Sequence, residues 1–123
     1  RRLKTSGSER KIPLVGASLW SARRVKQSDT AKQFAFPRYC NEQTHNSNSA
    51  SAALNKWLRS HAPGGCVVHS FRHSMRDRLR AVECPKEIIY QISGWSSSDV
   101  GESYGDGFSL NVLNKWLIEI VNC

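Results

Sequence analysis

Apolar residues recur at a helical period over most of this chain. They fall at i, i+3, i+4 and i+7, the spacing that puts side chains on one face of an α-helix. This period predicts helices from Ser47 or Ser49 to about 61, over 69–83 and over 110–121. Two further helices are predicted: residues 17–27, from apolar residues beside a basic face, and Pro85 to just before Gly94, from a proline suited to a first turn. The stretch between the first two helices lacks such a period and predicts a long loop.

The same pattern predicts which side chains form the core. Trp57 is expected to anchor its helix in the core. The helix predicted over 69–83 is expected to bury the stripe Phe71, Met75, Leu79 and Val82. The last helix is strongly amphipathic. It is expected to pack on this domain or on a neighbouring subunit.

Residues 1–15 differ from the rest and predict a β-hairpin. Residues 1–5 form one expected strand, residues 6–9 a turn rich in small and polar residues, and residues 10–15 the return strand. A hairpin this polar requires support from the domain or a ligand. The expected fold is therefore mainly α with a small N-terminal β-hairpin, an α+β domain spanning 1–123.

The net positive charge indicates what kind of partner the chain favours. The chain has 18 Lys and Arg against 10 Asp and Glu, a net charge of +8, and a pI near 9.7. Such an excess favours a polyanion, with nucleic acid first and an acidic membrane surface second. Charge alone is also compatible with a basic protein that binds neither.

The four cysteines do not suggest metal binding. Cys40, Cys66, Cys84 and Cys123 form no C-x-x-C pair and match no zinc spacing. They are expected to be reduced thiols in a cytoplasmic protein. No apolar run approaches the roughly 18 residues of a membrane span, and no signal peptide is recognisable.

Candidate chemistry begins at the predicted helix from residue 69. His69 and Arg72 are three residues apart, so both side chains lie near the start of that helix. A helix start attracts anions through its free N–H groups and its dipole. These groups are suited to binding one phosphate together, although a solvated His–Arg pair has the same spacing.

Further along, Tyr104 lies among small and polar residues rather than in an apolar pattern. It follows Gly94-Trp95, which ends the short helix begun by Pro85. The predicted helices around Pro85 also fit a helix-turn-helix reader of DNA. Lys4 is expected near the tip of the hairpin, and taken alone it is better interpreted as a solvated surface lysine.

Taken together, the order and spacing of these residues resemble the catalytic domain of a tyrosine recombinase, the phage-integrase family. Members carry an H-x-x-R box, then a Gly-His or Gly-Trp pair, then a nucleophilic tyrosine. Here Trp95 lies 23 positions after Arg72, and Tyr104 nine after Trp95. The run Ser8 to Leu14 after Lys4, the Phe36-Pro37 pair and residues 104–110 are also similar to prophage-type integrases.

The resemblance covers nearly the whole chain and implies site-specific DNA recombination or integration, the reaction of a mobile-element enzyme. It implies cleavage through a 3′-phosphotyrosyl bond, without metal or cofactor. The implied catalytic residues are Tyr104, Arg72, His69, Lys4 and Trp95, with His73 supporting them and Arg10 and Arg76 contacting DNA. The implied partners are double-stranded DNA and further copies of the chain, as a tetramer on DNA, with no membrane and no small-molecule substrate.

Two departures from the family pattern matter. The family's first arginine precedes the hairpin, so the sequence is expected to be a fragment that also lacks the core-binding domain and is inactive alone. Trp95 replaces the commoner histidine, so it receives no proton-transfer role. Two alternatives remain: relaxation of DNA by a type IB topoisomerase-like enzyme, and a non-catalytic helix-turn-helix module.

Overall fold

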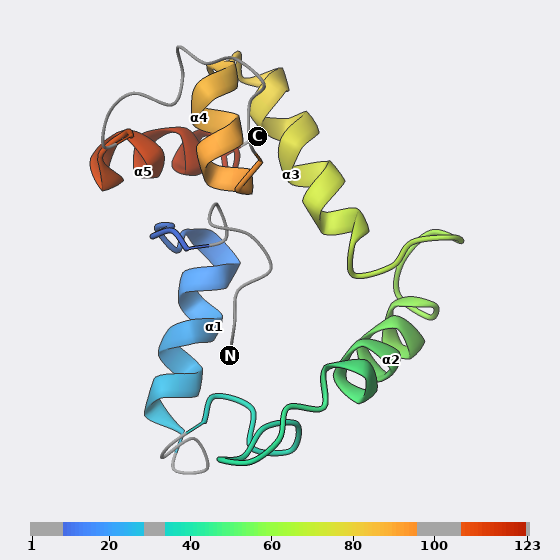
Figure 1. Ribbon diagram of the computed structural model, residues 1–123. Helices are drawn as coiled ribbons and strands as arrows, with labels where there is room; N and C mark the ends of the chain where they lie inside the picture. Colours follow the sequence, from blue (N-terminus) through green and yellow to red (C-terminus); the bar gives the residue numbers. More distant parts are fainter. Residues whose placement is uncertain (1–8, 29–33, 96–106, 123) are drawn as a thin grey trace. The chain divides into compact units, whose positions relative to one another are not determined.

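The computed structural model describes residues 9–28, 34–95 and 107–122. Over these residues the chain is mainly helical, as predicted, with five helices and no strand (Figure 1). The helices are α1 (Gly16–Gln27), α2 (Ser47–Leu58), α3 (Ser70–Ala81), α4 (Lys86–Ser93) and α5 (Leu110–Glu119). Each predicted helix is present, with ends that shift by a few residues.

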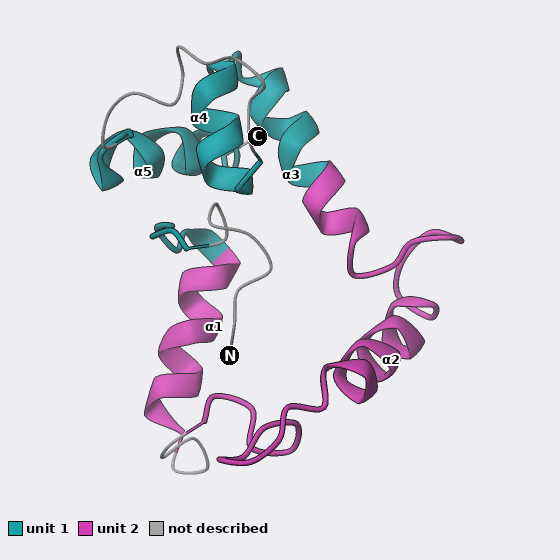
Figure 2. Cartoon of the chain, viewed as in Figure 1, with its two compact units in different colours: residues 1–16, 74–123 teal, residues 17–73 magenta. Residues whose placement is uncertain are grey.

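The chain divides into two compact units (Figure 2). Unit 1 comprises residues 1–16 and 74–123, and unit 2 comprises residues 17–73. The boundary falls inside α3, whose first turn belongs to unit 2 and whose remainder belongs to unit 1.

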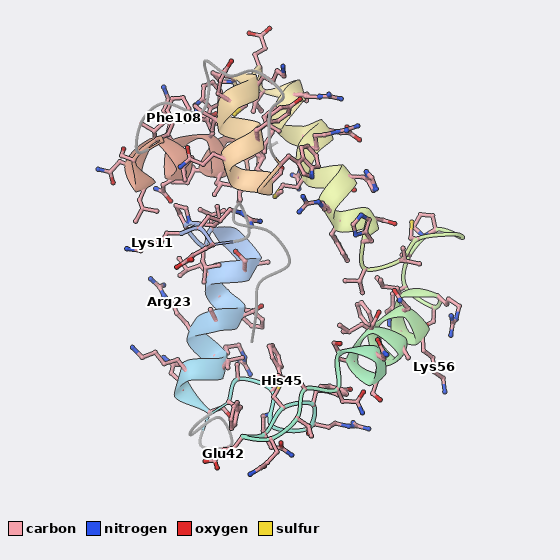
Figure 3. All side chains as sticks on the ribbon, viewed as in Figure 1. Lys11, Arg23, Glu42, His45, Lys56 and Phe108 are labelled. Carbon is pink, nitrogen blue, oxygen red and sulfur yellow. The ribbon has the colours of Figure 1, made fainter. Side chains whose placement is uncertain are left out.

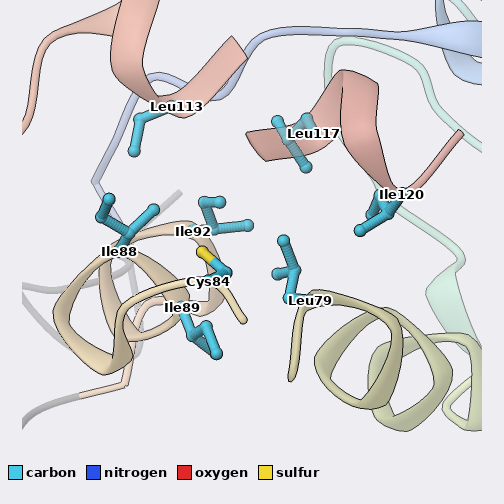
Figure 4. Packing of buried hydrophobic residues seen from close by; sticks show 8 residues of the cluster. All are labelled: Leu79, Cys84, Ile88, Ile89, Ile92, Leu113, Leu117 and Ile120. Carbon is cyan, nitrogen blue, oxygen red and sulfur yellow. The ribbon is translucent and has the colours of Figure 1, made fainter. Parts of the chain in front are cut away.

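Unit 1 has a hydrophobic core built by α3, α4, α5 and the turn between α3 and α4. Leu79 and Leu113 are fully buried within it. The remaining members are Cys84, Ile88, Ile89, Ile92, Leu117 and Ile120 (Figure 4). The predicted amphipathic C-terminal helix therefore packs on its own domain. Burial in this apolar surrounding raises the pKa of the Cys84 thiol to about 11, so Cys84 is a neutral core residue at physiological pH.

The turn between α3 and α4 is closed by a left-handed residue. Glu83 has φ of 58°, and its N–H donates to the Arg80 carbonyl oxygen at 2.9 Å. The next N–H, of Cys84, donates to the Leu79 carbonyl oxygen at 3.0 Å. These two bonds form a Schellman motif. They let α4 begin at once after Pro85.

Unit 2 contains α1 apart from its first residue, Gly16, together with α2, the first turn of α3 and the connecting loops. The loop after α1 carries one isolated antiparallel bridge, between Cys40 and His45. The side chain of Asn46 caps α2 by accepting from the Ser49 N–H at 3.0 Å. The predicted caps, Ser47 and Ser49, are wrong because α2 begins at Ser47 and the carboxamide of the preceding residue, Asn46, takes the capping position.

Two predicted core residues are exposed. Trp57 is 56% exposed and Phe71 64%, whereas Met75, Leu79 and Val82 contact the core as expected. The period identified an apolar face correctly, but a face is buried only where another element covers it. Trp57 instead stacks on His61 at 4.2 Å between ring centroids, within its own helix end.

The predicted return strand is also wrong. Residues 9–15 form no strand in the structure, and the first predicted strand and the turn up to Ser8 lie outside the described residues. Side-chain contacts, and not backbone hydrogen bonds between strands, hold this segment in place. Ile12 and Val15 pack against the core of unit 1, and Arg10 bonds to the end of α4.

Among the residues that the structure describes, no helix has the length and apolar character needed to cross a membrane.

Candidate functional site

The start of α3 is fixed by bonds within unit 2. The N–H of Val68 donates to Oδ1 of Asn55 in α2 at 2.8 Å. The N–H of Val67 donates to the Ser70 hydroxyl at 3.1 Å. The chain then enters the helix as the Arg72 N–H donates to the His69 carbonyl oxygen at 3.0 Å. His69 is therefore the residue immediately before α3, presented from a turn anchored to α2.

Three predicted site residues gather at this helix start. His69 and His73 are exposed, and their rings meet edge to face with centroids 5.2 Å apart. Arg72, half-buried, lies between them in sequence and three residues after His69. The first turn of α3 has no acidic residue. The cluster thus offers an imidazole and a guanidinium beside a helix N-terminus, an arrangement suited to an oxyanion.

The second predicted element, Trp95, is held by the end of α4. Gly94 is left-handed with φ of 66° and donates its N–H to the Gln91 carbonyl oxygen at 3.3 Å. The N–H of Trp95 donates to the Tyr90 carbonyl oxygen at 3.1 Å. This is a second Schellman motif, and it fixes where the backbone of Trp95 leaves the helix.

The side chain of Arg10 binds the last carbonyl groups of α4. The Schellman bonds satisfy the carbonyls of Tyr90 and Gln91, which leaves those of Ile92 and Ser93. The Nε of Arg10 donates to the Ile92 carbonyl oxygen at 3.1 Å, and its Nη2 donates to that of Ser93 at 3.3 Å. A cation at a helix C-terminus is also favoured by the helix dipole. Arg10 remains a predicted DNA contact, but the structure gives it this structural role.

Among the described residues, Arg76 and Tyr90 lie against the Trp95 ring. Cζ of Arg76 lies 5.6 Å from its centroid, within the range of a cation–π interaction. The Tyr90 ring meets it edge to face at 6.0 Å. Nε of Arg76 is buried, and its ion-pair distance to Asp77 Oδ1, 3.6 Å, exceeds hydrogen-bond reach. Arg76 therefore lies over the indole face, and its Nε has no hydrogen-bond partner among the described residues.

Two hydrogen bonds join Gln91 of α4 to the backbone of Phe108. Nε2 of Gln91 donates to the Phe108 carbonyl oxygen at 3.0 Å, and the Phe108 N–H donates to Gln91 Oε1 at 2.7 Å. Trp95 and Phe108 flank the stretch 96–106. Both flanks of that stretch are thus tied to α4.

The predicted site is described in part. The structure brings His69 beside His73, and Trp95 beside Arg76. Lys4 and Tyr104 lie outside the described residues. The sequence analysis did not identify Gln91, which bonds to Phe108, or Tyr90, which contacts the Trp95 ring. The one sequence signal for Gln91 was its position on a helix shortly before Gly94.

Positive charge is distributed unevenly between the units. Unit 2 has eight Lys and Arg against two acidic residues, a net charge of +6, and all four histidines. Unit 1 has ten against eight, a net charge of +2. Most of the excess charge therefore belongs to the unit that carries His69 and Arg72.

Within the described part of the chain, no group of three or more His, Cys, Asp or Glu side chains is placed to hold a metal ion. Comparison with models of known protein families, with curated proteins and with solved structures found no match to this chain.

Proposed function

We propose that this chain is part of the catalytic domain of a tyrosine recombinase and acts on double-stranded DNA. The observation that supports this most directly is the cluster at the start of α3. There, Arg72 and two histidines stand at a helix N-terminus free of acidic residues, in the unit that carries most of the positive charge. Such a cluster suits a phosphodiester. The matched spacing of Arg72, Trp95 and Tyr104 adds the reaction type.

The proposed reaction is a transesterification. The Tyr104 oxygen attacks the scissile phosphorus, the bond from phosphorus to the 5′-oxygen breaks, and a 3′-phosphotyrosyl bond forms. The free 5′-hydroxyl of a partner strand reverses the step. Because the phosphodiester bond is conserved in the intermediate, the proposed reaction consumes no nucleotide.

Each role follows from the chemistry of the group. A phenol has a pKa of about 10, so Tyr104 must lose its proton during attack, and His69 is the proposed acceptor. Arg72 offers a planar fork to two non-bridging oxygens. Lys4 is proposed to protonate the leaving 5′-oxygen. Trp95 is proposed to donate its indole N–H to a phosphate oxygen, oriented by Arg76 and Tyr90.

The phosphate site is tested by titrating the chain with inorganic phosphate and following the imidazole resonances of His69 and His73 by NMR. Phosphate is expected to shift both resonances. Arg72→Ala should abolish the shifts, and Arg78→Ala, which removes the same charge further along α3, should preserve them. Unchanged resonances of His69 in the native chain would contradict the proposed site.

The chemistry is tested with a nicked duplex whose scissile 5′-oxygen is replaced by sulfur, a leaving group that needs no proton from Lys4. The chain is fused behind a segment that carries the first arginine implied by the resemblance. A covalent protein–DNA adduct of this fusion is expected on denaturing gels, and Tyr104→Phe should remove it while preserving DNA binding. An adduct that persists in Tyr104→Phe would exclude this nucleophile. DNA binding without an adduct from that same fusion would favour the non-catalytic module.

A topoisomerase-like activity is distinguished by its substrate. A recombinase requires paired sites and several subunits, whereas a relaxing enzyme acts on any supercoiled circle. Relaxation of a plasmid without a recombination site would therefore favour the alternative.

A further inference from the structure

Helix α1 has two faces of different character. Leu19, Ala22 and Val25 are half-buried and follow the inner side of the helix. Trp20, Arg23, Arg24 and Gln27 recur at i, i+3, i+4 and i+7, and all four are exposed. We call these four residues the outer face of α1. No residue of α1 is fully buried.

The outer face is cationic and contains a large exposed aromatic ring. Trp20 is 61% exposed, and Cζ of Arg24 lies 4.9 Å from its ring centroid. Arg23 extends outward from the helix (Figure 3). α1 contains no acidic residue, and Lys26 adds a further cation in its last turn. These cations therefore have no internal neutralising partner within the helix.

We propose that the outer face of α1 is a docking surface for the sugar–phosphate backbone of duplex DNA, additional to the phosphate cluster at His69 and Arg72. Charge complementarity selects a polyanion for a face with two arginines and no acid in a unit of net charge +6. Gln27 and the indole N–H add neutral donors for phosphate or sugar oxygens. This proposal rests on the proposed function, which supplies DNA as the substrate.

Arginines that contact phosphates have a measurable signature. Each neutralised phosphate releases counterions and contributes about 0.9 to the slope of log affinity against log salt. Loss of Arg23 and Arg24 should therefore reduce that slope by about 1.8 and weaken binding roughly 30-fold near physiological salt.

The test measures binding of the chain to a labelled duplex by fluorescence anisotropy over a series of salt concentrations. The variant is Arg23→Ala/Arg24→Ala. The control, Lys86→Ala/Lys115→Ala, removes the same charge and also lies against aromatic rings, because Lys86 is 5.2 Å from Tyr90 and Lys115 is 5.5 Å from Trp116. Circular dichroism verifies that both variants fold. Arg23→Lys/Arg24→Lys keeps the charge and should keep the slope.

The outcomes separate the two proposals. A reduced slope in the α1 variant and an unchanged slope in the control support a DNA contact on α1. An unchanged slope in the α1 variant, or an equal reduction in both, overturns this inference and leaves the proposed function intact. If the native chain binds no duplex at all, the proposed function fails, and the inference fails with it.

Discussion

The two units of this molecule differ in how far their apolar side chains are buried. Unit 1 encloses eight hydrophobic residues in one core and carries a net charge of +2. Unit 2 carries a net charge of +6, and Leu58 is the one residue of its described part that is buried. Its large apolar side chains are mostly exposed, including Trp20, Trp57 and Phe71.

This difference indicates how each unit is stabilised. Burial of apolar surface supplies most of the stability of a folded domain, so unit 1 has its own driving force. Unit 2 has little of this driving force, and its concentrated positive charge opposes compactness through self-repulsion. A polyanion that neutralises this charge should therefore stabilise unit 2 more than unit 1.

The largest change in the free energy of unfolding is expected from a substitution in the core of unit 1. Leu113 is fully buried, and Leu113→Ala should lower the free energy of unfolding by about 2–5 kcal/mol, because it removes apolar contacts and leaves a cavity. The matched change in unit 2 is Leu54→Ala at a 51% exposed position, where the loss should stay within about 0.5 kcal/mol. Urea denaturation followed by circular dichroism measures both. Equal losses would mean that the two units do not differ in burial.

A smaller effect is expected at the end of α4. Arg10→Ala leaves the carbonyls of Ile92 and Ser93 without their guanidinium donor and should cost about 1–2 kcal/mol. Lys11→Ala removes the same charge from the neighbouring exposed position and should change stability by less than about 0.5 kcal/mol. Arg10→Lys should recover only part of the loss, because an ammonium cannot reproduce the fork. Similar effects of Arg10→Ala and Lys11→Ala would show that charge, and not the helix end, matters.

The clamp on Phe108 should contribute about 1 kcal/mol. Gln91→Ala removes both of its bonds, so the Phe108 amide should lose its protection from hydrogen exchange. Gln27→Ala, an exposed glutamine at the end of α1, is the control and should leave that amide unchanged. If Phe108 stays protected in Gln91→Ala, the clamp does not hold the residue in solution.

The helices were predictable because their signals are local. The 3.6-residue period predicted α2, α3 and α5, apolar residues beside a basic face predicted α1, and Pro85 and Gly94 predicted the start and end of α4. The exposure of Trp57 and Phe71 was not predictable in the same way, since the period identifies an apolar face without identifying what covers it. The strand prediction over 10–15 failed because side chains hold this segment: Arg10 bonds to Ile92 and Ser93, 82 and 83 residues away, and Ile12 and Val15 pack against the core.

The site was predictable to a similar extent. The closeness of His69 and His73 follows from their positions one helical turn apart. The contact of Arg76 with Trp95 joins two different elements, so no local pattern encodes it. Lys4 and Tyr104 lie outside the described residues, and their place in the site remains a prediction.

The smallest expected effect concerns the turn that lets unit 1 close its core. Glu83 adopts φ of 58°, a left-handed conformation that costs a residue with a Cβ about 1–2 kcal/mol. Glycine adopts it freely but loses about 0.5–1 kcal/mol more backbone entropy on folding. Glu83→Gly should therefore stabilise the protein by about 0.5–1 kcal/mol, which thermal unfolding measures as a higher midpoint.

The control removes the same side chain from a right-handed position nearby. Glu87 lies in the first turn of α4, where glycine is a poor helix former and where the carboxylate interacts favourably with the helix dipole. Glu87→Gly should lower the free energy of unfolding by about 1 kcal/mol. Opposite signs for the two changes would attribute the gain at Glu83 to backbone conformation. If both changes stabilised the protein, loss of negative charge would explain the gain, and the Schellman turn would carry no strain.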